Sequence, residues 1–481
     1  MTQDNRSDRP QGRPPEGEAR LSRVEAQLRG PFLFFFVAAV AWLLAASVLG
    51  LIAALQQGSL AGGPFRDCEW FTYGHVVSAR RELFAYGWAC NAFFALNLWL
   101  LSQLGRFEFR NGWVSVLGGV AWNLAVAYGA CRIFAGEQNP FALLAFPREV
   151  GPVLGVAFLL AGFWPIVAFA RRPTGHTFAS QWYVVGASFA FPLTYLLAQL
   201  VVLWQPASGV VQAIAHAWFV ADFRLLWLAA SALALTYYFL PKLLNRPIGG
   251  YYLAPVGFWT FFLFAGWTGP SALIGAPVPL WVQSIGVVAG AMLVVPVIVT
   301  AINFHGTLSA ESGWSRAWND TTLRFVSLAA LAFTASGLLN AVFGFRVYNA
   351  LVRFTSFPAG QEQLLAYGFV TLTIFGAAYY VLPRLTGADW PSAKLIHAHF
   401  WAVALGLAVS LVALLVGGWQ AGKQLADAAV PFSQVAKAGS AWDLALVLSA
   451  ALFLVGHAAF ALNALGMIFR SSSPASQGRH D

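Results

Sequence analysis

A set of ionisable and amide side chains stands inside stretches of this sequence that are otherwise apolar. Its members are Arg80, Arg81, Glu82, Asp222, Arg224, Gln361, Glu362 and Gln363. An arginine inside a bilayer costs about 2.5 to 3.5 kcal/mol on insertion scales unless it is paired or hydrated. One interpretation is therefore an ion pair from one of the two adjacent arginines to Glu82 or Glu362. The other is that both arginines extend to the outer surface of the membrane.

Asp222 and Arg224 form a second polar group. Residues two apart on a helix point to different faces, so each of these two side chains needs a partner of its own. Charges of this kind inside a membrane indicate a proton or ion path by default. A structural bond between neighbouring helices explains them equally well.

The composition places the chain in a membrane. Of its 481 residues 59% are hydrophobic and only 10% are charged, whereas about a quarter of a soluble globular protein is charged. The net charge of +9 does not indicate nucleic-acid binding, because the basic residues are spread singly over short connections. Cys68, Cys90 and Cys131 form no CxxC or CxxCH motif, so neither a disulfide framework nor a covalent haem attachment is expected.

Twelve apolar stretches are long enough to cross about 30 Å of hydrocarbon as helices. They cover approximately residues 31–55, 82–104, 113–134, 151–170, 178–204, 215–240, 251–274, 281–304, 321–345, 363–383, 397–418 and 441–468. The sequence therefore predicts an all-α integral membrane protein with a twelve-helix membrane domain over residues 30–470. Residues 1–29 are predicted to form a disordered basic cytoplasmic tail with a possible helical end. Residues 471–481 are predicted to form a second cytoplasmic tail.

The basic residues predict the orientation of the bundle. Several short connections on the side of the arginine-rich N-terminus carry lysine or arginine, whereas the connections at 205–214 and 275–280 on the other side carry neither. Basic residues prefer the cytoplasmic side of a membrane, so we expect both termini in the cytoplasm.

One phrase occurs twice in the sequence. "TYYFLPKL" at 236–243 closes the sixth predicted span, and "AYYVLPRL" at 378–385 closes the tenth. Tyrosines suit the headgroup region, the proline is expected to stop the helix, and the basic residue remains in water. Because the copies lie four helices apart, they favour three pseudo-repeated arcs of four helices over two halves of six. A chance match between two common helix endings is the alternative.

Together with these endings, "WNLAVAYG" at 122–129, "WTGP" at 267–270 and "HAHFWAVALG" at 397–406 resemble the catalytic large subunit, subunit I, of the haem-copper oxidases. The chain is most similar to the C-type (cbb-type) cytochrome c oxidases and next to the large subunit of bacterial nitric oxide reductase. This resemblance implies a bacterial inner membrane location and haem b and copper as cofactors. It also implies a hetero-oligomer with a cytochrome c-type or other respiratory membrane subunit, surrounded by membrane lipid.

The family holds its haems and copper through six histidines on helices 2, 6, 7 and 10. At the matching positions this chain has Arg80 on the second span, Ala221 on the sixth, Ser271 and Ala272 after "WTGP", and Gln361 and Gln363 on the tenth. Iron and copper need a neutral basic nitrogen, which arginine and alanine cannot supply and glutamine supplies poorly. We therefore expect neither haem nor copper at the family's positions.

Two other histidines, His216 and His457, lie near membrane depth on the sixth and twelfth spans. They are candidates for a haem pair outside the family's pattern, although they come from opposite halves of the bilayer. A lone histidine in a membrane more often bonds to a neighbouring helix.

Three classes of function follow from the sequence. The first is a degenerate, haem- and copper-free homologue of cytochrome c oxidase subunit I that acts as a scaffold or accessory subunit of a respiratory or electron-transfer membrane complex. The second is an active haem-copper terminal oxidase or nitric oxide reductase subunit, as the resemblance alone implies. The third is a proton or solute pathway that reuses the helical bundle.

Overall fold

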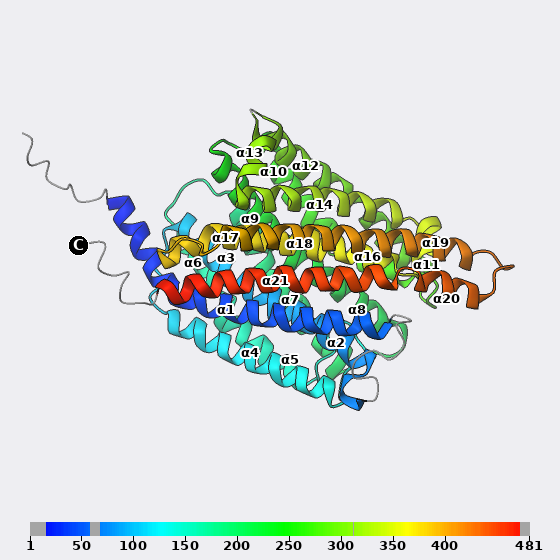
Figure 1. Cartoon of the computed structure of the whole chain (residues 1–481). Helices are drawn as coiled ribbons and strands as arrows, with labels where there is room; N and C mark the ends of the chain where they lie inside the picture. Colours follow the sequence, from blue (N-terminus) through cyan, green and yellow to red (C-terminus); the bar gives the residue numbers. More distant parts are fainter. Residues whose placement is uncertain (1–15, 58–67, 311, 472–481) are drawn as a thin grey trace, which may run out of the picture.

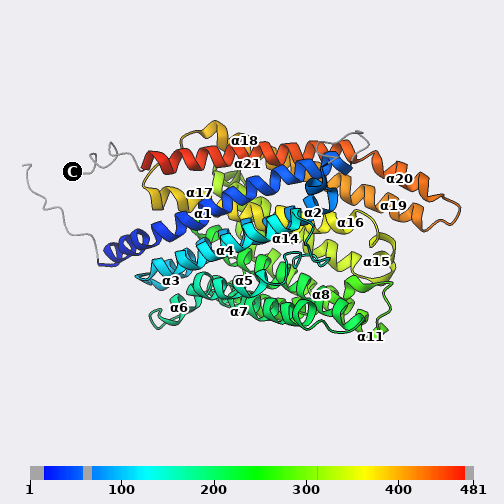
Figure 2. The same cartoon turned by 90° about the horizontal axis from the view of Figure 1, so that it is seen from below.

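The structure is a computed structural model that describes residues 16–57, 68–310 and 312–471. Every regular element assigned in these ranges is helical, and the long helices run side by side in one bundle (Figure 1; Figure 2). The start of α1 and the end of α21 lie at the same end of the bundle (Figure 1).

The α-helices are α1 (Glu16–Gln57), α2 (Tyr73–Glu82), α3 (Cys90–Gly105), α4 (Gly112–Phe134), α5 (Val150–Ala161), α6 (Trp164–Ala170), α7 (Ala179–Ala198), α8 (Val210–Asp222), α9 (Ala230–Leu244), α10 (Ala254–Ala265), α11 (Leu280–Met292), α12 (Val294–Ser309), α13 (Gly313–Asn319), α14 (Thr321–Phe343), α15 (Arg346–Val352), α16 (Phe357–Gln363), α17 (Leu372–Thr386), α18 (Ala393–Leu411), α19 (Gly417–Leu425), α20 (Phe432–Ser440) and α21 (Asp443–Ser471). The π-helical segments are η2 (Leu83–Ala89), η3 (Gln199–Trp204), η4 (Phe223–Ala229), η7 (Leu364–Thr371) and η8 (Val412–Val416). Three short 3-10 turns are η1 (Glu69–Phe71), η5 (Tyr251–Leu253) and η6 (Gly269–Leu273).

Several of these elements join end to end, and within the described ranges eleven helices are long and apolar enough to cross a membrane. They correspond to eleven of the twelve predicted spans, which confirms an all-α membrane bundle. The seventh predicted span, 251–274, forms only the short helix α10 before the turn η6. Gly266, Gly269 and Pro270 explain the early end, because glycine weakens a helix and proline supplies no N–H to continue it.

Three spans form the centre of the bundle. They are the second (α2, η2 and α3), the sixth (α8, η4 and α9) and the tenth (α16, η7 and α17), and each contains a long π-helical segment. In their most apolar parts 94%, 78% and 83% of the residues are buried, against 33 to 50% in the other long helices of the described ranges. Buried central spans with a π-helical segment therefore recur every four helices in the structure, as the repeated phrase predicts.

Side chains join the three central spans directly. The Asn97 amide donates to the Ser231 hydroxyl at 3.0 Å, which ties the second span to the sixth. The Trp88 indole N–H donates to the Thr371 hydroxyl at 3.3 Å and ties the second span to the tenth. These polar bonds are fully buried, where a donor or acceptor without a partner would be costly.

The two copies of the repeated phrase end in the same way, but not at the proline. Pro241 lies inside α9 and Pro383 inside α17, so the prediction that proline stops each helix is wrong by about one turn. The helices end at Asn245 (φ 53°) and Gly387 (φ 67°), whose backbone N–H groups donate to the proline carbonyls four residues earlier. Proline has no N–H to donate, but its carbonyl can still accept the last hydrogen bond of the helix. That bond is donated by a capping residue whose backbone is in the left-handed conformation.

The first helix is longer than the predicted span 31–55 and begins well before it. α1 begins at Glu16, so residues 16–29 of the predicted N-terminal tail are helical. Val24 and Leu28, one turn apart, are buried against the bundle, and the Glu25 carboxylate lies 3.3 Å from the Arg384 guanidinium. The remaining parts of the predicted tails, 1–15 and 472–481, lie outside the described residues.

The packing of η6 against α11 gives a matched pair of substitutions. A Cβ at Gly286 would overlap the backbone nitrogen of Ser271, whereas one at Gly290, a turn later on α11, would meet nothing within 4 Å. We expect Gly286→Ala to lower the free energy of unfolding by about 1 to 3 kcal/mol because the backbone cannot move aside. Gly290→Ala should be neutral or stabilising. Thermal unfolding of both variants in detergent checks this, and equal melting temperatures would contradict the close packing.

Candidate functional site

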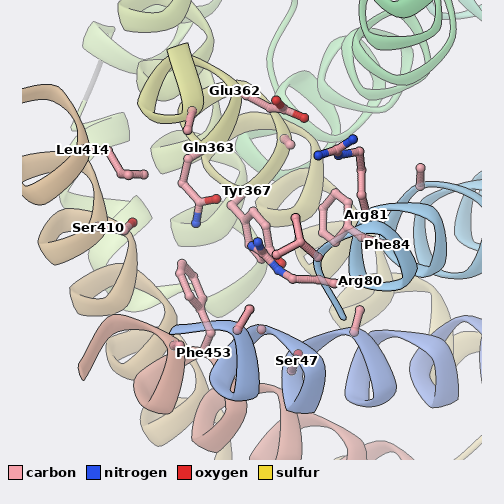
Figure 3. A pocket seen from close by; sticks show the side chains of 18 of the residues that line it. Ser47, Arg80, Arg81, Phe84, Glu362, Gln363, Tyr367, Ser410, Leu414 and Phe453 are labelled. Carbon is pink, nitrogen blue, oxygen red and sulfur yellow. The ribbon is translucent and has the colours of Figure 1, made fainter. Parts of the chain in front are cut away.

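A cavity of about 340 Å³ lies among α1, the three central spans, α18 and α21. Five of the eight predicted polar residues line it: Arg80, Arg81, Arg224, Glu362 and Gln363. Figure 3 shows side chains of the second span facing those of the tenth across this space. The structure therefore brings together residues that lie almost 300 positions apart in the sequence.

Arg224 and Glu362 form the ion pair of the cavity. The Arg224 Nη2 atom lies 2.7 Å from the Glu362 Oε2 atom, and the two side chains are 29% and 38% exposed. The sequence offered Arg80 or Arg81 as one possible partner of Glu362, but the direct ion pair in the structure is made by Arg224 of the sixth span. In the described part of the chain no carboxylate lies within 4 Å of the Arg80 or Arg81 guanidinium.

Arg80 and Arg81 are half-buried on the last turn of α2. Arg80 packs along α1, where a Cβ added at Gly50 would lie 3.2 Å from its Nε atom. Figure 3 shows the Arg80 side chain reaching toward Tyr367 and the Arg81 side chain on the same side of the cavity as Glu362. Both arginines line the cavity, so they are not only surface residues.

A further arginine stands close to the ion pair. Burial lowers the pKa of Arg353, which follows α15 outside the long apolar helices, and the positive charge of Arg224 lowers it further. Arginine remains protonated at neutral pH even so. The electrostatic environment of Glu362 is therefore cationic.

Glu82 and Asp222 are buried but do not line the cavity. The Oε1 atom of Glu82 accepts a hydrogen bond from the Ala145 N–H at 3.3 Å, and its Oε2 atom has no partner among the described residues. Neither carboxylate oxygen of Asp222 has such a partner. Gln361 does not line the cavity either, although Glu362 and Gln363 do.

Asp222 lies where the sixth span meets the shortened seventh. A Cβ at Gly269 would overlap Trp218, and one at Gly266 would lie 3.9 Å from Leu226. Residues 218, 222 and 226 follow one another at intervals of four and so share one face of a helix. This places Asp222 on the face of the sixth span that packs against the end of α10 and η6.

Aromatic rings cover the apolar part of the cavity. The Tyr367 ring stacks on Phe84 with centroids 4.6 Å apart and lies 4.8 Å from the Phe453 ring. The sequence did not identify these residues, or Ser47, Ser410 and Leu414, as part of a site, because they belong to helices with a uniformly apolar sequence. Only the tertiary packing distinguishes them from ordinary core residues.

His216 and His457 have separate partners. The His216 Nε2–H donates to the Ala142 carbonyl at 3.0 Å. The fully buried His457 donates from Nδ1 to the Ser47 hydroxyl at 2.7 Å, since that hydroxyl itself donates to the Leu43 carbonyl. Neither histidine lines the cavity. The structure therefore does not bring them together as a haem pair, and each bonds to a neighbouring segment instead.

The residues present do not fit the family's haem or copper. Arg80 and Gln363 line the cavity from the second and tenth spans. No histidine among the described residues lines it. The Ser271 hydroxyl donates to the Thr268 carbonyl at 2.7 Å. In the described ranges no three histidine, cysteine, aspartate or glutamate side chains gather as a metal site would require.

A bundle of this topology, with three buried central spans around a polar cavity, defines a membrane protein built like the large subunit of a respiratory oxidase. The family model for cytochrome c and quinol oxidase polypeptide I matches residues 31–471. The chain therefore belongs to this family, as its sequence motifs imply.

Known relatives agree with this assignment. The chain is 25% identical over 463 residues to a "cytochrome c oxidase subunit 1 homolog, bacteroid" of Bradyrhizobium diazoefficiens, a match that covers 90% of this chain and 81% of the relative. It is 24% identical to the CcoN1 subunit of the cbb3-type cytochrome c oxidase of Stutzerimonas stutzeri, with 89% and 92% covered. A solved structure described as a heme-copper terminal oxidase dimer shares the fold with a TM-score of 0.74, at 14% identity and with 95% of this chain and 84% of that chain covered.

The Arg224–Glu362 pair gives a second prediction. Glu362→Gln leaves Arg224 without its negative partner, at a cavity wall that already carries Arg80 and Arg81, so we expect a loss of about 1 to 2 kcal/mol, between the values of exposed and buried pairs. Adding Arg224→Gln should recover part of that loss. Thermal unfolding in detergent measures both.

The local pair of Arg132 and Glu137 supplies the control, because its glutamate is 51% exposed and both residues lie at or just beyond one end of α4. Glu137→Gln should change stability by less than about 1 kcal/mol. If Glu362→Gln were no more destabilising than Glu137→Gln, or if the double variant were additive, the ion pair would not hold the sixth and tenth spans together.

Proposed function

We propose that this chain is a haem- and copper-free homologue of cytochrome c oxidase subunit I that serves as a structural subunit of a respiratory membrane complex. The observation that carries the proposal is the donor set. The family's six ligand positions hold arginine, alanine, serine and glutamine, and the two that line the cavity are Arg80 and Gln363. A protonated guanidinium has no lone pair for iron.

The retained architecture supports a role in assembly. The three central spans keep their buried contacts, and many large apolar side chains remain exposed on the outer helices, as lipid or partner subunits require. Relatives of this chain are named as oxidase subunits. We infer a hetero-oligomer in the bacterial inner membrane with a membrane-anchored cytochrome c or another respiratory subunit. Both termini lie in the cytoplasm in this proposal, as the basic residues of the connections predict.

The cofactor content of the isolated chain tests the proposal. We expect optical spectra of the purified protein without haem b bands, and iron and copper well below one atom per chain. The cbb3-type subunit of Stutzerimonas stutzeri, prepared in the same way, is the positive control. Stoichiometric haem b in the isolated chain would overturn the proposal, whereas haem that separates with a co-purified partner would not.

Asp222 favours one second candidate, a proton path. A buried carboxylate with no hydrogen-bond partner among the described residues is typical of groups that exchange protons within membranes. If protons cross this bundle, Asp222→Asn should reduce proton uptake into proteoliposomes to that of empty vesicles. Arg224→Gln should also alter it, whereas the exposed Asp427→Asn should not. Equal uptake by wild type and Asp222→Asn would remove this candidate.

A further inference from the structure

We propose that the cavity among the second, sixth and tenth spans binds an amphipathic anion, a molecule with a carboxylate or phosphate head and an apolar body. The inference rests on the proposed function in one respect, since the cavity can accept such a molecule only if no haem occupies the same place. Its volume of about 340 Å³ lies within the range of small-molecule sites, about 300 to 1,000 Å³.

The charges of the cavity wall require an anion. Three arginines and one glutamate line it, and the glutamate is engaged by Arg224. The guanidinium groups of Arg80 and Arg81 have no carboxylate within 4 Å in the described part of the chain. Both guanidinium groups line the cavity, and a planar guanidinium matches the oxygens of a carboxylate or phosphate, which can accept paired hydrogen bonds from it.

The opposite part of the wall requires an apolar body. Phe453 and Leu414 lie on the far side of the cavity from Arg81, with the Tyr367 ring between them (Figure 3). Ser47 offers little polarity there, because its hydroxyl already donates to Leu43 and accepts from His457. A free inorganic ion would leave these apolar surfaces uncovered, whereas an acyl chain would bury them.

The cavity opens to the exterior at the end of the bundle away from the start of α1 and the end of α21 (Figure 1). Gln57, at the end of α1, and Tyr73, at the start of α2, both line it and are both exposed. The Tyr73 hydroxyl donates to the Gln57 side chain at 3.3 Å across this opening. An amphiphile can therefore enter from the headgroup region, either as an anionic phospholipid of the bilayer or as a free fatty acid.

Native mass spectrometry and binding titrations of the full chain in detergent test the inference. The probes are oleate, phosphatidylglycerol, zwitterionic phosphatidylcholine and inorganic phosphate. We expect one oleate or one phosphatidylglycerol per chain, and affinity at least about tenfold weaker in the Arg80→Gln/Arg81→Gln variant. Tighter binding of oleate identifies a fatty acid as the source, and tighter binding of phosphatidylglycerol identifies a membrane lipid.

Two further variants keep the test independent of folding defects. Arg148→Gln removes an exposed arginine that packs over Trp204 and does not line the cavity, so it should bind as wild type does. Leu414→Trp fills the apolar side of the cavity without touching its charges, and it should reduce binding of oleate by about tenfold while thermal unfolding shows a folded chain.

The contrary outcomes are distinct from those of the proposed function. Three results would overturn the amphiphile site alone. The first is equal binding of phosphatidylcholine and phosphatidylglycerol together with no binding of oleate. The others are binding of phosphate as tight as that of oleate, and no effect of Leu414→Trp on binding. Haem b bands in the spectrum of the same sample would overturn the proposed function, whatever the lipid result.

Discussion

The direct packing of three central spans against one another is the constraint on which the rest of this structure depends. Asn97 with Ser231 and Trp88 with Thr371 connect these spans through buried polar bonds, and aromatic rings fill the space between them. Lipid offers no hydrophobic driving force between helices, so close packing and polar bonds must hold them together. The other long helices surround this centre, and their lower burial follows from facing lipid.

The same arrangement does not depend on the polar residues of the cavity wall. The buried bonds and ring contacts that join the three central spans involve neither Arg80 nor Gln363, which line the cavity beside Tyr367. The Arg224–Glu362 pair neutralises part of the charge that the arginines bring into the bundle. Under the proposed function, the chemistry of the site differs from that of the family while the architecture is the same.

Several particular residues show how far the sequence predicted this site. Five of the eight polar residues singled out from the sequence line one cavity, because a charge in an apolar stretch must find a partner or water. The choice of partner was not predictable. Glu362 had three arginines within plausible reach, and only the rotation and depth of the sixth span bring Arg224 within bonding distance. The apolar wall was missed entirely, since Tyr367, Phe453 and Leu414 differ from other core residues only in what lies beside them.

The sequence by itself determined the membrane environment, the number and order of the long helices apart from the shortened seventh, the period of four and the family. These features depend on composition, on apolar length and on residue identity, all of which are local. The tertiary structure alone decided where the first helix begins, that the two prolines lie inside their helices, which charges pair, and that the two histidines near membrane depth stay apart. Each of these depends on neighbours distant in the chain, because helix ends and ion pairs form where packing leaves room for them.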